Sequence, residues 1–177
     1  MLTPVLLALG ACAAIPSGPT PPPQCVPDQL RAHAERAEAG MGHITRRIIV
    51  QNISHHRCVL SAGIPRLQLL TVQGVALQTR QQPFPYPGAA AISTQNIVLR
   101  SAETATFWMH YATQTGYGYA SCPWASAIAL RLPGLTTPLH LVMRLRPYGG
   151  LLPHPTCGEI GVTPLQSHRT NLPSARE

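Results

Sequence analysis

The stretch 41–63, MGHITRRIIVQNISHHRCVLSAG, constrains the fold most strongly because it holds a strand, a turn and a cysteine in direct succession. Ile44, Arg46, Ile48 and Val50 recur at the two-residue period that places side chains on one face of a β-strand. Ile49 adds an apolar residue to the opposite face, which favours a central strand covered on both sides. The stretch therefore predicts a sheet with this segment inside it.

The rest of the chain repeats short strand patterns between turn residues. Prolines (19) and glycines (14) are abundant and only 11% of residues are charged, a balance that favours short strands over long helices. Segment 28–40 fits a helix or a strand, and its alternation favours a strand over 29–37. We predict a hairpin turn at Gln73-Gly74 and a loop over 81–93. The pattern predicts an all-β fold, a β-sandwich of about seven to nine antiparallel strands.

The N-terminal residues predict export. Residues 1–11 form an apolar run too short to span a bilayer, as in a signal peptide. Leu9-Gly10-Ala11-Cys12 has the order of a bacterial lipobox, which implies lipidation of Cys12, although Ala11-Cys12-Ala13 also fits an ordinary cleavage site that would remove this cysteine. Residues 12–24 are a Pro-rich tether. The folded domain is predicted over 25–165, with a flexible tail over 166–177.

The cysteine count agrees with export. With Cys12 lipidated, an even number remains, and oxidation is the default outside the cytosol. Four cysteines allow three connectivities. The preferred pairing joins Cys25 to Cys58 and Cys122 to Cys157, since each bridge would fix the start of a segment to a nearby strand end.

Several short motifs carry a family resemblance over about residues 25–165. The matching pieces are Cys25, Asp28-Gln29-Leu30, Gly42-His43, Val50 to Ser54, Cys58-Val59-Leu60 with Gly63 and Pro65, Leu99, Ala105, Cys122, Leu130 to Gly134, Cys157 and Val162-Thr163-Pro164. In this order and spacing they resemble the bacterial secreted domain of unknown function 4232 family.

The resemblance implies an immunoglobulin-like (Ig-like) sandwich on exported, often lipid-anchored proteins, with no catalytic residues to carry over. Two departures stand out. The segment from Cys58 to Pro65 has one residue more than the family pattern, with Ile64 in the aromatic place, and Ser101-Ala102 replaces the usual Pro-Gly.

No recognised catalytic motif is present, so we predict no enzyme activity and no cofactor. The nucleophile elbow, the H-E-x-x-H zinc motif and the phosphate-binding glycine loops are all absent. A glycosidase would need two facing carboxylates, and the central segments offer only Glu103 and Glu159, far apart in sequence.

The eight histidines raise metal binding as an alternative. Met41 with His43 and Met109 with His110 suggest soft copper ligation. However, adjacent residues on a strand point to opposite faces, so Met109 and His110 could not share one ion. We therefore predict that His55 and His56 are solvated turn residues, that His43 is a hydrogen-bonded structural residue, and that no metal site is present.

Two features suggest a partner surface. Tyr117, Tyr119 and Trp124 lie in a Gly-rich segment beside Cys122, where exposed aromatics suit sugar or protein contact, although packing over a disulfide explains them equally well. All 13 basic residues are arginines, against six acids, which gives a net charge of +7. Those among Arg46, Arg47, Arg131, Arg144 and Arg146 that face outward would either line up into a basic stripe or belong to an ordinary solvated sheet face.

Together these features predict an exported bacterial lipoprotein of the cell envelope, acting as a non-catalytic binding or structural module. Its partners would be the membrane, through the lipid, and an envelope protein, a glycan or an anionic lipid, but not nucleic acid. A periplasmic copper- or zinc-binding protein is the first alternative, and an unrecognised envelope hydrolase is the second.

Overall fold

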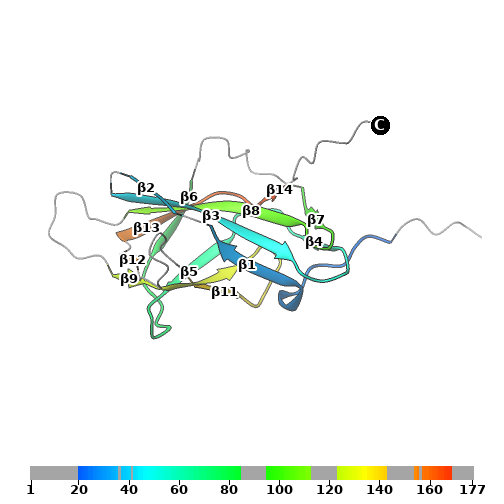
Figure 1. Cartoon of the computed structure of the whole chain (residues 1–177), viewed down its shortest axis with the longest axis horizontal. Helices are drawn as coiled ribbons and strands as arrows, with labels where there is room; N and C mark the ends of the chain where they lie inside the picture. The colour runs from blue at the N-terminus through cyan, green and yellow to red at the C-terminus, as the bar shows by residue number, and fades with distance from the viewer. Residues whose placement is uncertain are drawn as a thin grey trace, which may run out of the picture.

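The computed structural model describes residues 20–35, 37–40, 42–84, 95–112, 123–142, 154–155 and 157–168, with the backbone alone at residues 154, 155, 157 and 168. These residues form one short 3-10 helix, η1 (Pro27–Gln29), and fourteen strands (Figure 1). The all-β prediction is confirmed. In this part of the chain, no helix has the length and apolar character needed to cross a membrane.

The larger sheet has seven strands and is built around the longest two. Its main path runs in the order β1-β3-β8-β13-β6, while β2 pairs with β3 and β14 pairs with β8. The bounds are β1 (Leu30–Ala34), β2 (Glu38–Gly40), β3 (His43–Asn52), β6 (Arg80–Pro83), β8 (Thr104–Ala112), β13 (Cys157–Val162) and β14 (Gln166–His168).

The remaining strands form three smaller sheets. A three-stranded sheet has the order β11-β10-β5, and two pairs join β4 to β7 and β9 to β12. The bounds are β4 (Cys58–Leu60), β5 (Arg66–Leu70), β7 (Ile97–Leu99), β9 (Trp124–Ala125), β10 (Ala127–Arg131), β11 (Leu139–Val142) and β12 (His154–Pro155).

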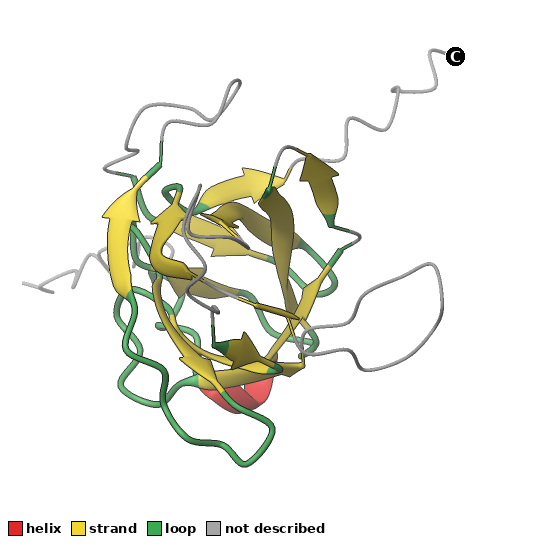
Figure 2. Ribbon diagram, turned by 90° about the vertical axis from the view of Figure 1, so that its left-hand side faces the viewer, coloured by secondary structure: helices red, strands yellow, loops and turns green. Residues whose placement is uncertain are grey.

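The central pair β3 and β8 confirms the alternation seen in the sequence. Antiparallel pairing sets Ile48 opposite Phe107 and Val50 opposite Ala105, and all four side chains are buried. Their faces meet the inner residues of β5 and β10, so the two sheets enclose one hydrophobic core. Figure 1 shows the two sheets as two layers, and Figure 2, turned by 90°, shows the strands around a common interior.

One end of the molecule is tied together by a disulfide, and we call it the stapled end, defined as residues 23–26, 52–60 and 97–103. Cys25 and Cys58 are joined with their Cα atoms 4.8 Å apart, the pairing preferred from the sequence. The Cys25 N–H donates to the carbonyl of Val59, and the Val59 N–H donates to the carbonyl of Pro23. The chain that enters the domain is therefore held alongside β4.

Three details differ from the prediction. The described residues form fourteen strands rather than the seven to nine expected, because short pairings of two or three residues, such as β9 with β12 and β4 with β7, add to the number. Segment 81–93 was expected to be a loop, yet Arg80–Pro83 form β6, which pairs with β13 in parallel rather than antiparallel. The strand expected over 29–37 is β1 (Leu30–Ala34), preceded by η1.

The predicted turn at Gln73-Gly74 is present, with Gly74 at φ 79°. Among the described residues, its second arm contributes only a bridge at Ala76.

Candidate functional site

A side-chain amide joins the edges of the two sheets. The Leu67 N–H of β5 donates to Gln81 Oε1 of β6 at 2.9 Å, and Gln81 Nε2 donates to the carbonyl of Pro65 at 2.7 Å. No pairing between the backbones of β5 and β6 is present in the described residues. At this junction, which we call the seam (residues 65–67 and Gln81), two hydrogen bonds of one glutamine side chain connect the sheets instead.

A groove of about 820 Å³ lies beside this seam, and we call it the seam groove. This volume is within the range of about 300–1,000 Å³ typical of ligand sites. Its polar lining consists of Arg66, Gln68, Gln81, Gln82 and Arg131. Its apolar lining consists of Ile64, Leu67, Pro83, Ala129 and Pro138.

The two arginines of the seam groove face each other across neighbouring strands. Arg66 of β5 and Arg131 of β10 are direct partners in the antiparallel register, and both are exposed. Directly opposite residues have Cα atoms about 4.5–5.5 Å apart and side chains on the same face of the sheet. The register therefore concentrates two permanent positive charges on one side of the groove.

None of the described lining residues is acidic. The acidic side chains that the structure describes belong to Asp28, Glu35, Glu38, Glu103 and Glu159, and each lies elsewhere. Glu35 pairs with Arg47, Glu159 with Arg80 at 3.9 Å, and Glu103 accepts from the Arg100 N–H. The positive charge in the groove is thus left without a carboxylate from its own lining.

A second hollow, of about 620 Å³, adjoins the first. The two share Gln68, whose Nε2 donates to the carbonyl of Leu77 at 2.7 Å, and Arg80 lies in the second hollow. The concave surface therefore continues past Gln68 to the segment 76–80.

The outer face of the larger sheet carries a stack of rings. The His110 ring stacks on Phe84 at 4.4 Å and on His43 at 5.0 Å, and His110 Nδ1 is 3.0 Å from Thr45 Oγ1. Phe84 lies over Gly161, where an added Cβ would come within 2.7 Å of it. Burial, followed by the neighbouring His43, lowers the pKa of His110. The sequence did not indicate this pair, because 67 positions separate the two histidines.

The three described arginines among those named for a basic stripe do not line up into one. Arg46 is 1% exposed on the inner face of β3, where burial lowers its pKa, and nearby Tyr111 is buried with a pKa raised to about 12. Arg47 pairs with Glu35 at 2.5 Å, and its Cζ lies 5.8 Å from the centre of the Trp108 ring. Arg131 is exposed on the other sheet, while Arg144 and Arg146 lie outside the described residues.

The histidine predictions have mixed outcomes. His55 and His56 are exposed in a turn, as expected, and Met109 is buried while His110 points to the other face of β8. His43 was expected to be hydrogen-bonded, and the contact observed is the ring stack. Within the described residues, no group of three His, Cys, Asp or Glu side chains lies close enough to hold a metal ion.

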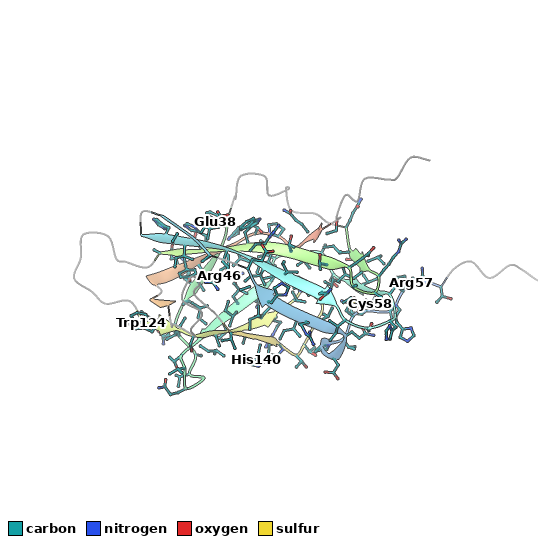
Figure 3. All side chains as sticks on the ribbon, viewed as in Figure 1. Glu38, Arg46, Arg57, Cys58, Trp124 and His140 are labelled. Carbon is teal, nitrogen blue, oxygen red and sulfur yellow. A yellow bond between two sulfur atoms is a disulfide. The ribbon has the colours of Figure 1, made fainter. Side chains whose placement is uncertain are left out.

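Of the candidate partner residues, Trp124 is 56% exposed on β9, at the opposite end of the long axis from Cys58 (Figure 3). Tyr117 and Tyr119 lie outside the described residues. So do Cys12 and Cys122, and the side chain of Cys157 is not described. The proposed lipidation and the second disulfide therefore stay predictions.

The two carboxylates considered for hydrolysis lie apart. Glu103 precedes the first residue of β8, whereas Glu159 adjoins Ile160, which pairs with Tyr111 near the other end of that strand. The seven residue-to-residue steps from Thr104 to Tyr111 span about 23 Å of strand. Glycosidase carboxylates lie no more than about 9.5 Å apart, so these two cannot act on one bond.

Distant motif pieces meet beside the seam. Gly63 adopts φ 138°, its Cβ position would lie 3.3 Å from Pro133, and its carbonyl accepts from the Leu165 N–H. Gly134, at φ 81°, lies so close to Ser61 that a Cβ would come within 2.5 Å of the hydroxyl. Family-motif residues that are far apart in sequence, such as Gly63 and Pro133, therefore contact each other at one place in the fold.

The chain was compared with known proteins. It matched no curated protein and no solved structure. One family model, described as a domain of unknown function (DUF4232), matches residues 25–166, which include every described strand except the last residues of β14. The chain therefore belongs to the DUF4232 family.

Proposed function

We propose that the chain is an exported bacterial lipoprotein whose domain is a non-catalytic binding module of the cell envelope, with the seam groove as its binding site. The single observation behind this proposal is the pair of exposed arginines that face each other in a groove with no acidic lining residue among those described. Such a groove has unused binding capacity for a ligand that supplies negative charge.

The compartment is proposed from the first part of the chain. The lipobox at Leu9 to Cys12 predicts an anchor, and a disulfide such as Cys25–Cys58 is typical of oxidising compartments outside the cytosol. The tether would enter the domain at the stapled end. In this arrangement Cys58 lies at the tether side, and Trp124 lies far from it (Figure 3).

The finer architecture that we propose is an Ig-like sandwich. Two sheets that share one core, with β3 and β8 as the central antiparallel pair, support this assignment. The parallel pairing of β6 with β13 at the sheet edge is the feature that a solved structure should examine first.

Binding is favoured over catalysis by the chemistry of the groove. Its described lining offers guanidinium and amide groups together with apolar side chains. A nucleophile with an adjacent general base, which acyl transfer requires, is not among those lining residues.

The test begins with the protein purified from its native bacterial membrane fraction. Intact mass and cysteine peptide mapping should give a diacylglyceryl or triacyl Cys12 and two internal disulfides. Cosedimentation of the Cys12→Ser variant, which carries no lipid anchor, with isolated cell-envelope material should then show saturable binding, and Arg66→Gln should weaken it. A free or missing Cys12 with reduced thiols would refute export, and absence of any envelope binding would refute the binding module.

Metal binding is the second candidate function, because His43 and His110 lie together on one face of the larger sheet. Their rings are stacked with an angle of 14° between planes, an arrangement in which the nitrogens do not converge on one point. Zinc or copper bound stoichiometrically to the purified protein, and lost in His110→Ala, would favour this alternative.

A further inference from the structure

The register of β5 and β10 places two like charges directly opposite each other. Like charges in this position destabilise an antiparallel pair. No ion pair to Arg66 or Arg131 is present among the described residues, and the lining offers no carboxylate. An anion seated between the two guanidinium groups would remove the repulsion, because each group can donate two parallel hydrogen bonds to a carboxylate or a phosphate.

The neighbouring side chains suit hydroxyl groups and apolar carbon. Gln82 contributes a half-buried amide, which can donate to and accept from hydroxyl groups. Ile64, Pro83 and Pro138 supply apolar surface beside it. Charge, amide and apolar surface in one groove match a saccharide that carries an acidic group.

The shape of the site favours a polymer. The second hollow continues beyond Gln68 and contains Arg80, which is paired with Glu159 at 3.9 Å, so the concave surface extends over more than one site. A bilayer is broad and flat, and its anionic head groups are reached best by protruding basic residues. The two facing arginines line a recess instead.

Resting on the binding function proposed above, we propose that the seam groove binds an anionic polysaccharide of the envelope, with a carboxylate or phosphate group held between Arg66 and Arg131. Repulsion between Arg66 and Arg131 destabilises the free protein, and a bound anion removes this repulsion. Binding and stability are therefore linked at these two residues.

The test uses the full chain and calorimetric titration at low and moderate salt. The acidic probes are oligogalacturonate and a phosphorylated mannan oligosaccharide, and their neutral counterparts are methyl-esterified oligogalacturonate and the unphosphorylated mannan. At least one acidic probe should bind, and its neutral counterpart should bind at least about tenfold more weakly. Phosphatidylglycerol vesicles form a separate arm.

The variants make the assignment specific. Arg66→Gln and Arg131→Gln should each weaken the acidic probe about ten- to a hundredfold, as expected for loss of a charge-assisted contact. Arg31→Gln, an exposed strand arginine on the larger sheet, makes the same change of net charge and should leave affinity within about twofold. Without ligand, Arg131→Gln should melt at the same temperature as the natural protein or higher.

Four outcomes would overturn the proposal. They are no binding of either acidic probe, equal binding of acidic and neutral probes, equal weakening by Arg31→Gln and Arg131→Gln, and binding to vesicles alone. If the protein still cosediments with envelope material in any of these cases, the binding module stands and only the anionic polysaccharide is wrong. If cosedimentation also fails, both proposals fall.

Discussion

At the stapled end the buried Asn52 side chain makes four hydrogen bonds, whereas in the seam groove Arg66 and Arg131 face each other without an acidic lining residue. Asn52 Nδ2 donates to the carbonyls of His56 and Leu99, and Oδ1 accepts from the backbone and hydroxyl of Ser54. At the stapled end the polar groups of Asn52 are satisfied within the fold. In the seam groove the two arginines have no carboxylate partner in the lining, an arrangement expected where stability is given up for binding.

Loss of the disulfide at the stapled end should lower the free energy of unfolding more than any other change considered below. Cys25→Ser with Cys58→Ser should lower the free energy of unfolding by about 3–4 kcal/mol, because the bridge closes a loop with a sequence separation of 33. Urea unfolding under oxidising conditions measures the loss. Cys25→Ser alone, which leaves Cys58 as a free thiol, shows by comparison with the double variant whether thiol exchange contributes. An unchanged midpoint in the first variant would show that the stapled end does not limit stability.

Removal of the Asn52 side chain comes next. Asn52→Ala should destabilise by about 2–3 kcal/mol, since the buried carbonyl of Leu99 loses its donor. Asn96, whose side chain is exposed and accepts only from the Ala62 N–H among the bonds described, is the matched control. Asn96→Ala should cost under about 1 kcal/mol. Equal losses in chemical denaturation would contradict the distinction between buried and exposed amides.

The seam should be weaker than the stapled end. Gln81→Ala should cost about 1–2 kcal/mol and speed hydrogen exchange at the Leu67 amide, because that N–H loses its acceptor. Gln82→Ala on the same strand is the control and should leave this amide protected. Unaltered exchange in Gln81→Ala would mean that β5 and β6 are held together by other contacts.

A change in the opposite direction is expected at Ala102. This residue adopts φ 65°, a region that glycine occupies at no steric cost, and it stands where the family pattern has glycine. Ala102→Gly should therefore stabilise by about 0.5–1 kcal/mol in thermal or urea unfolding. Ala129→Gly, in the middle of β10, should destabilise by a similar amount. Destabilisation by both changes would show that Ala102 is not strained.

The smallest effect concerns His110 of β8, on which the Phe84 ring stacks. Its pKa is lowered in the folded protein, so the unfolded chain takes up the proton more readily. Its contribution to stability is present above about pH 6.5, the ordinary pKa, and fades as the pH falls through that value towards the lower folded pKa. Phe84→Ala uncovers the ring and should raise this pKa towards its ordinary value in an NMR titration. Phe84→Leu should keep it low, and equal pKa values in the two variants would contradict the role of the ring.

The sequence predicted the parts of the fold that depend on local alternation. Ile48 and Val50 in β3 recur at the strand period and are buried as expected. Arg46 shares that period, and the same alternation places it in the core. By contrast, β6 has the sequence Arg-Gln-Gln-Pro, which contains no apolar alternation and becomes a strand only through its pairing with β13.

The candidate site was beyond sequence reasoning for a related reason. Arg131 was named from the sequence, but its partner Arg66 lies 65 positions away. Their opposition depends on the register between β5 and β10, which no local pattern encodes. The amide of Gln81 acts across two sheet edges in the same way. The His43–His110 stack likewise needs the pairing of β3 with β8.

The attachment of the incoming chain to β4 also decides where a mechanical load would go. Gln24 runs parallel to Val59 in an isolated bridge, and the disulfide lies one residue further along. A pull on the preceding residues would act along this pair in shear, and the covalent bond would stop the chain from peeling away from β4. Tension would thus pass directly from Cys25 to Cys58, without first separating the incoming chain from β4.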